Sequence, residues 1–240
     1  TIMKYSTAFI RTLAYILIKD KGAVILILYS SNQRLWFEKL RRSVELQVKR
    51  LVCQTSITPE ALYDFPETDI YDSFACVSAG CDMCCECVDS AVVHPISRRL
   101  VMLPKLSRES YHRVLLQRSV VLDPFPFGMG VTALESFSLG VPIITLPMYQ
   151  SAPPLVLGMI RRMGVDGSTM IADNITEYVN LAIRMASSQF SREEIVRSIL
   201  SRADVLFEDS AVIGDWEEML NFVYTTVRNG IENIGARSIG

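Results

Sequence analysis

Hydrophobic positions recur along this chain with two different periods, and the two periods alternate. Apolar residues three or four positions apart predict helices at 4–19, 34–51, 107–117, 131–139, 155–163, 175–186, 192–202 and 211–228. Short apolar runs predict strands at 23–29, 99–103, 120–122 and 142–146, and the first of these has the composition of a strand buried on both faces. Ser191 and Glu194 form a capping box that predicts the start of the helix at 192–202. Strands that alternate with helices of this length predict an α/β domain with a doubly wound, mostly parallel sheet.

Residues 119–147 contain the densest run of structural signals in the chain. Asp123 and two prolines end the strand at 120–122, and Gly128-Met129-Gly130 follows them. The helix at 131–139 begins directly after these glycines, and Gly140 ends it. The segment therefore predicts a strand, a glycine loop, a helix and a second strand in that order.

This order of elements is suited to binding a phosphate group. The first turn of a helix has unpaired N–H groups and a partial positive charge. Thr132 adds a hydroxyl in that turn, and Glu135, one turn later, can accept hydrogen bonds from ribose hydroxyls. The alternative is an ordinary βαβ turn in which Gly128 and Gly130 only relieve steric crowding. The Gly-x-Gly spacing by itself does not separate the two interpretations.

Residues 123–147, DPFPFGMGVTALESFSLGVPIITLP, resemble the nucleotide-binding signature of the O-linked N-acetylglucosaminyltransferase and SPINDLY-type glycosyltransferases. That family has the GT-B architecture of two Rossmann-like lobes, and its C-terminal lobe holds most of the nucleotide-sugar. The resemblance implies that residues 1–240 form one Rossmann-like C-terminal lobe. Residues 53–95 have no counterpart in it and are interpreted as a cysteine-rich insertion or loop.

The resemblance also implies roles for residues outside the glycine loop. Lys4 matches a family lysine at the nucleotide diphosphate, where an ammonium offsets charge on the leaving group. The backbone of Leu106 and the side chain of Arg108 match positions that meet the base and ribose, and Tyr111 matches a ring that stacks on the base. The alternatives are a solvated lysine at position 4 and a half-buried tyrosine at position 111.

Within the loop and helix, the resemblance places the diphosphate at Gly128, Gly130, Val131 and Thr132, and the ribose at Glu135. The helix dipole also stabilises a glutamate near a helix N-terminus without any ligand. Several positions depart from the family pattern, and two of them bear on the rival interpretations. Val131 replaces a hydroxyl-bearing residue, and Pro154 stands where the family has an arginine.

The implied activity is transfer of a sugar, N-acetylglucosamine foremost, from a UDP-sugar to serine or threonine of a protein. SPINDLY-type relatives use GDP-fucose, so a protein O-fucosyltransferase stays open. The donor is a substrate, and the family needs neither a metal nor a further cofactor. We expect an N-terminal lobe and tetratricopeptide repeats to be missing from this chain, and we expect the isolated chain to be inactive. The rivals are a degenerate, non-catalytic lobe that acts as an interaction module and a GT-B sugar-nucleotide epimerase.

Composition narrows the choice of partners. The net charge is −2, which gives no reason to expect nucleic acid or a membrane surface as a partner. No apolar run reaches the roughly 18 to 20 residues that a bilayer span requires. The chain opens at Thr1 instead of a methionine, so we expect it to be a fragment of a longer protein. It shows no cleavable signal sequence, so we expect that protein to be cytoplasmic or nuclear.

The cysteines gather in one short region. Cys76, Cys81, Cys84, Cys85 and Cys87 precede His94. This set could complete a zinc site, but a second C-x-x-C or a paired histidine with regular spacing is missing. Reduced thiols in a variable loop are the alternative.

Overall fold

The structure is a computed structural model, and it describes residues 5–28, 34–54, 90–117, 120–148, 153–187, 189–207 and 209–237. The chain divides into two compact units, Thr1–Ala203 and Asp204–Gly240. The first unit contains the sheets and the candidate site, and the second contains the long C-terminal helix.

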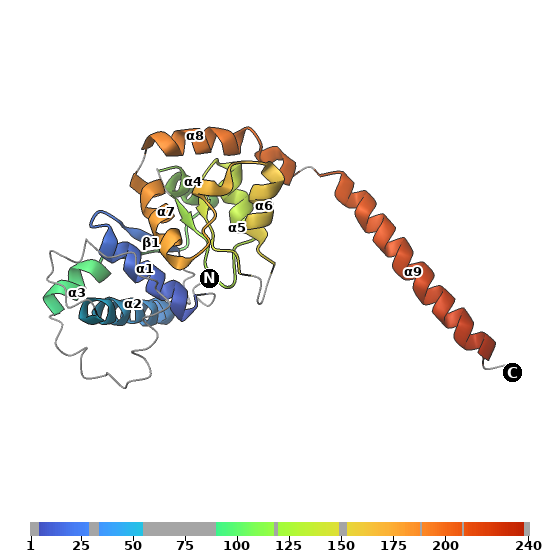
Figure 1. The fold of residues 1–240 in the computed structure, drawn as a ribbon, viewed down its shortest axis with the longest axis horizontal. Helices are drawn as coiled ribbons and strands as arrows, with labels where there is room; N and C mark the ends of the chain where they lie inside the picture. Colours follow the sequence, from blue (N-terminus) through green and yellow to red (C-terminus); the bar gives the residue numbers. More distant parts are fainter. Residues whose placement is uncertain are drawn as a thin grey trace. The chain divides into compact units, whose positions relative to one another are not determined.

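The described elements follow the alternating order that the sequence predicts (Figure 1). They are α1 Thr7–Lys19, β1 Ile25–Leu28, α2 Arg34–Gln54, α3 Ser90–Ser97, β2 Leu100–Leu103, α4 Arg108–Leu116, β3 Val121–Leu122, α5 Val131–Ser138, β4 Ile143–Ile144, α6 Leu155–Met163, η5 Gly167–Thr169, α7 Ile175–Ser187, α8 Gln189–Leu200, η6 Ala203–Leu206 and α9 Ala211–Arg237. Each predicted helix and strand has a counterpart of the same type. The sequence did not predict α3, which contains Pro95 within its helical run.

The strands pair in two small parallel sheets. Strands β1 and β2 pair from Ile25 with Leu100 to Leu28 with Leu103. Strands β3 and β4 pair Val121 with Ile143. The fold is therefore a helix-rich α/β arrangement with short parallel sheets. The described residues do not confirm a continuous doubly wound sheet.

Strand β1 is buried on one face only, which corrects the prediction of burial on both. Ile25 and Ile27 are buried, whereas Leu26 is 42% and Leu28 37% exposed. An apolar run cannot show which face of a strand is buried, because every position in it is apolar. The strand's pairing and the helices packed against it decide which face is buried.

A cluster of three aromatic rings packs α1 and α7 against the loop after β3. Phe9 of α1 lies 5.3 Å from Phe125 and 6.5 Å from Tyr178, measured between ring centroids. Phe125 and Tyr178 are 5.5 Å apart, and all three pairs meet edge to face. These rings are buried, so the loop that begins at Asp123 lies directly on the hydrophobic core.

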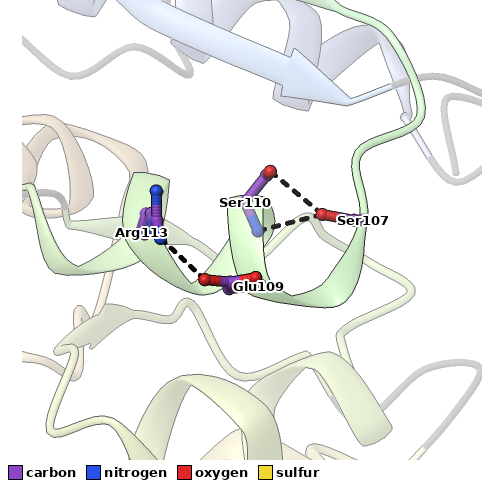
Figure 2. A network of polar contacts seen from close by, with 4 residues as sticks. All are labelled: Ser107, Glu109, Ser110 and Arg113. Atoms are coloured by element: carbon purple, nitrogen blue, oxygen red, sulfur yellow. Dashed lines mark hydrogen bonds and ion pairs between the residues drawn. The ribbon is translucent and has the colours of Figure 1, made fainter.

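The ends of several helices follow simple local rules. Ser107 caps α4 by accepting a hydrogen bond from the Ser110 N–H at 3.2 Å (Figure 2). Glu109 and Arg113 form an ion pair at 2.6 Å on the same helix, but both side chains are about three-quarters exposed, so the pair adds little stability. Gly140 ends α5 with a φ of +74°, as predicted.

One capping prediction is wrong. Helix α8 begins at Gln189, so Ser191 lies inside the helix and is not its N-cap. A capping box identifies a preferred start, but a helix extends past it when the preceding residues also adopt helical backbone angles. No helix in the described part of the chain combines the length and the hydrophobicity needed to cross a bilayer.

Candidate functional site

Asp123 fixes the loop between β3 and α5. Its side chain is only 5% exposed. One carboxylate oxygen, Oδ1, accepts the N–H of Met129 at 2.6 Å, and the other, Oδ2, accepts the hydroxyl of Thr145 at 2.7 Å. A single buried carboxylate thus holds both the end of the loop and the residue that follows β4.

The backbone of Asp123 is held as well. Its N–H donates to the oxygen of Ile144 at 2.9 Å, and its carbonyl accepts the hydroxyl of Tyr178 at 3.0 Å. Burial raises the pKa of the Tyr178 hydroxyl well above its ordinary value, and the charge of Asp123 raises this pKa further. The phenol therefore stays protonated and keeps donating to the loop.

Gly128 lies close against the Asp123 carboxylate. A Cβ at this position would lie 3.2 Å from both Oδ1 and Oδ2 of Asp123. A Cβ on Gly130 would lie 3.6 Å from Cδ1 of Leu155, which is an ordinary contact. A side chain at position 128 would therefore crowd the Asp123 carboxylate, whereas position 130 is less constrained.

The N-cap residue of α5 is a glycine, which has no side chain to cap the helix. Gly130 is its N-cap residue and makes no side-chain capping bond, and its carbonyl accepts the N–H of Ala133 at 2.8 Å. Val131 is 74% exposed, and Thr132 is also exposed. Among the described residues, the first two side chains of this helix therefore face solvent, at the end of a helix where N–H groups lack partners within the helix.

Tyr111 of α4 and Glu135 of α5 lie close enough to interact electrostatically. The pKa of Tyr111 is raised, first by burial and then by the negative charge of Glu135. A hydrogen bond with Ser136 acts in the opposite direction. Ser136 is fully buried and also donates to the backbone oxygen of Thr132 at 2.8 Å. The sequence did not single out Ser136, because a serine in a short helix usually has only a local role.

Two further predicted site residues, Leu106 and Arg108, lie close to Tyr111 along the chain. Arg108 is exposed in the first turn of α4, one turn before Tyr111, and Leu106 is half-buried just ahead of that helix. Positions 108 and 111 are neighbours on the helix surface because they are three residues apart.

The N-terminal end of the described chain is attached to the same loop. Ser6 caps α1, and its hydroxyl donates to the carbonyl of Phe125 at 2.7 Å. Tyr5 forms a β-bridge with Pro126. Lys4 lies outside the described residues, so its role stays a prediction.

A separate cleft lies between α2 and α3. Its volume is about 350 Å³, and it is lined by Arg42, Glu45, Leu46, Lys49, Val93 and His94. It shares no residue with the predicted site. The described residues contain no group of three His, Cys, Asp or Glu side chains able to hold a metal. The cysteines at 76–87 lie outside them, so the zinc alternative stays a prediction.

Comparison with known proteins identifies glycosyltransferases that act on proteins as relatives of this chain. No protein-family model matches the chain. It is 28% identical over 112 residues to the UDP-glucose:protein N-beta-glucosyltransferase of Actinobacillus pleuropneumoniae serotype 5b, which is 47% of this chain and 16% of that protein. It is also 28% identical over 104 residues to a probable UDP-N-acetylglucosamine–peptide N-acetylglucosaminyltransferase SPINDLY of Hordeum vulgare, which is 43% of this chain and 11% of that protein. The resemblance to O-GlcNAc transferase and SPINDLY-type glycosyltransferases is confirmed.

A solved structure supports the same likeness at the level of the fold. A mutant of the Thermobaculum terrenum O-GlcNAc transferase superposes with a TM-score of 0.57 at 16% identity, over 90% of this chain and 32% of that chain. The present chain thus spans at most about a third of the protein glycosyltransferases that it matches.

Proposed function

We propose that this chain is the C-terminal, nucleotide-sugar-binding lobe of a GT-B glycosyltransferase that acts on proteins. The observation that carries the proposal is the loop pinned by Asp123, which leads into an uncapped helix N-terminus near the Tyr111–Glu135 pair. A nucleoside diphosphate needs an anion site for its phosphates, an aromatic ring for its base and a hydrogen-bond acceptor for its ribose. The helix N-terminus, the half-buried Tyr111 and the carboxylate of Glu135 would supply these three groups. The Rossmann-like character of this lobe is part of the proposal.

Each part of the nucleotide would meet a different element. The diphosphate would accept hydrogen bonds from backbone N–H groups of the loop and first turn, at Gly128, Gly130, Val131 and Thr132. Glu135 would accept from ribose hydroxyls. The base would lie against Tyr111, beside Leu106 and Arg108, and Lys4 would offset charge on the departing diphosphate.

The reaction would break the bond between the anomeric carbon of the sugar and the diphosphate oxygen. A hydroxyl of a serine or threonine would form the new bond and lose its proton, and the nucleoside diphosphate would leave with the electron pair. The names of both curated relatives contain a UDP-sugar, which supports a uridine donor, with N-acetylglucosamine as the proposed sugar. A GDP-fucose donor is the alternative within the same proposal.

A degenerate lobe that binds partners without turnover is the second candidate. The exposed Val131 at the start of α5 and Pro154 as the N-cap residue of α6 favour it, because neither offers a side-chain donor to a phosphate. The two candidates differ in whether the site binds nucleotide.

Calorimetric titration of the 240-residue chain with UDP and with GDP tests the proposal. We expect UDP to bind, and we expect Glu135→Ala to weaken binding by about 10- to 150-fold, since a lost hydrogen bond to a charged group costs roughly 1.5–3 kcal/mol. Glu194→Ala, which removes an exposed glutamate of α8, is the matched control and should leave the affinity unchanged. Preference for GDP would move the assignment to a fucosyl donor. Binding of neither nucleotide would overturn the proposal in favour of the degenerate lobe.

A further inference from the structure

Helix α9 carries a long stripe of exposed apolar side chains. Eight large apolar or aromatic residues are between 45% and 66% exposed: Val212, Ile213, Trp216, Met219, Leu220, Val223, Tyr224 and Val227. They are spaced three and four positions apart and fall within about 140° of the helix circumference at 3.6 residues per turn. The sequence continues this spacing at Ile231 and Ile234.

This stripe needs a partner that its own unit does not supply. In the unit Asp204–Gly240, the described part outside α9 is limited to residues 204–207 and 209–210. Exposed apolar patches of this kind mark interaction surfaces, and most of the stability of a protein helix comes from packing its apolar face. The 27 residues of α9 correspond to about four heptads, enough for a stable pair of helices.

The charges beside the stripe indicate which partner fits. Glu217 and Arg228 both lie along the same edge, next to Tyr224, whereas Val212 and Met219 form the opposite edge. Antiparallel helices bring like edges together, so Glu217 of one copy would lie near Arg228 of the other, and the reverse pair would form by symmetry. A parallel pair would instead place Glu217 against the apolar edge of its partner.

We propose that α9 is a self-association surface that pairs antiparallel with α9 of a second copy of this chain. The apolar stripes form the interior, and two symmetric Glu217–Arg228 pairs flank it and set the orientation. The proposal does not depend on the nucleotide-binding function, because it uses no residue of the first unit.

Sedimentation equilibrium of the full 240-residue chain tests this proposal. We expect a dimer that dissociates on dilution. Leu220→Glu places a charge in the middle of the stripe and should raise the dissociation constant at least about tenfold. Phe222→Glu is the matched control, since Phe222 is 70% exposed but lies outside the stripe, on the polar side of the helix. This second variant should leave the dissociation constant unchanged.

Charge reversal tests the orientation and does not rely on disrupting the helix. Glu217→Arg and Arg228→Glu should each weaken the dimer a few-fold, because each places like charges together. The double variant should restore the original affinity. A chain that stays monomeric over the whole concentration range, an equal loss in Phe222→Glu, or no recovery in the double variant would each overturn the proposal.

Discussion

The hydroxyl of Tyr178 donates a hydrogen bond of 3.0 Å to the backbone carbonyl of Asp123, from a helix 55 residues further along the chain. Both groups are buried, so water does not compete for either. This bond connects α7 to the first residue of the candidate nucleotide loop. The shape of that loop therefore depends on the packing of α7 as well as on its own sequence.

Replacing Tyr178 with phenylalanine should destabilise the protein by about 1–3 kcal/mol, because the buried carbonyl of Asp123 loses its donor. The ring and its contacts with Phe9 and Phe125 are kept, so the change isolates the hydroxyl. Urea denaturation at neutral pH measures the effect. Tyr224→Phe, at a position 66% exposed on α9, is the control and should have no effect on the first unit. Equal stability of Tyr178→Phe and wild type would contradict the role of this bond.

Because of Tyr178, the free energy of unfolding should decrease at alkaline pH. Its pKa in the folded state is raised well above the ordinary value of 10.0, mainly by burial. The unfolded chain therefore releases this proton first, so the contribution to stability is complete below about pH 10 and is lost as the pH rises toward the folded-state pKa. Burial also raises the pKa values of Tyr5 and Tyr111, which act in the same direction.

Denaturation curves collected between roughly pH 8 and pH 11 measure this loss. Tyr178→Phe should show a smaller decline than wild type above pH 10, because the unfolded variant has one fewer phenol to ionise. Parallel declines in the two proteins would show that Tyr178 does not contribute.

Substitutions of Asp123 should separate its hydrogen-bonding role from its charge. Asp123→Ala leaves the Met129 N–H and the buried Thr145 hydroxyl without their acceptors, at an expected cost of about 2–4 kcal/mol. Asp123→Asn keeps one oxygen for Met129, and the hydroxyl of Thr145 can rotate to accept from the new amide. The asparagine variant should therefore retain more stability and more UDP affinity than the alanine variant. Equal losses in the two variants would mean that the charge itself is required.

Three glycines should respond to alanine in a fixed order. Gly158, in the interior of α6, has nothing within 4 Å of an added Cβ, so Gly158→Ala should stabilise the protein by about 0.5–1 kcal/mol. Gly128→Ala should destabilise moderately, because its Cβ would crowd the Asp123 carboxylate. Gly140→Ala should cost most, since φ is +74° and the new Cβ would lie 2.7 Å from Cγ of Leu200. Thermal denaturation of the three variants checks this ranking, and any other order would contradict the packing around these glycines.

The sequence predicted the bounds of a helix well where a regular apolar stripe and a terminating residue agree. Helix α6 has the predicted bounds, because its apolar stripe is regular and Gly164 ends it in the left-handed region. Helix α3 was missed because its first six residues lie within 53–95, for which the sequence predicts an insertion or loop, and Pro95, which normally ends a helix, lies inside it. The capping box at Ser191 predicted a start for α8 that is too late. The local signal is present, but the helix begins at Gln189.

The candidate site was predictable only through resemblance to known enzymes. Resemblance assigned Tyr111 and Glu135 to one site, and the structure brings their side chains within electrostatic reach. For Asp123, the sequence pattern indicates only that the residue ends a strand. Its partners Thr145 and Tyr178 are 22 and 55 positions away, and no local pattern indicates contacts over such separations.

The hydrogen bond from the Met129 N–H to the Asp123 carboxylate allows opening of the loop to be measured by hydrogen exchange. Backbone amides in a loop ordinarily exchange their hydrogens with solvent quickly, but this one can exchange only when the buried carboxylate releases it. The deuterium uptake of a single amide therefore measures how often the entrance to α5 opens. A nucleotide bound there would slow that uptake without touching Met129 itself.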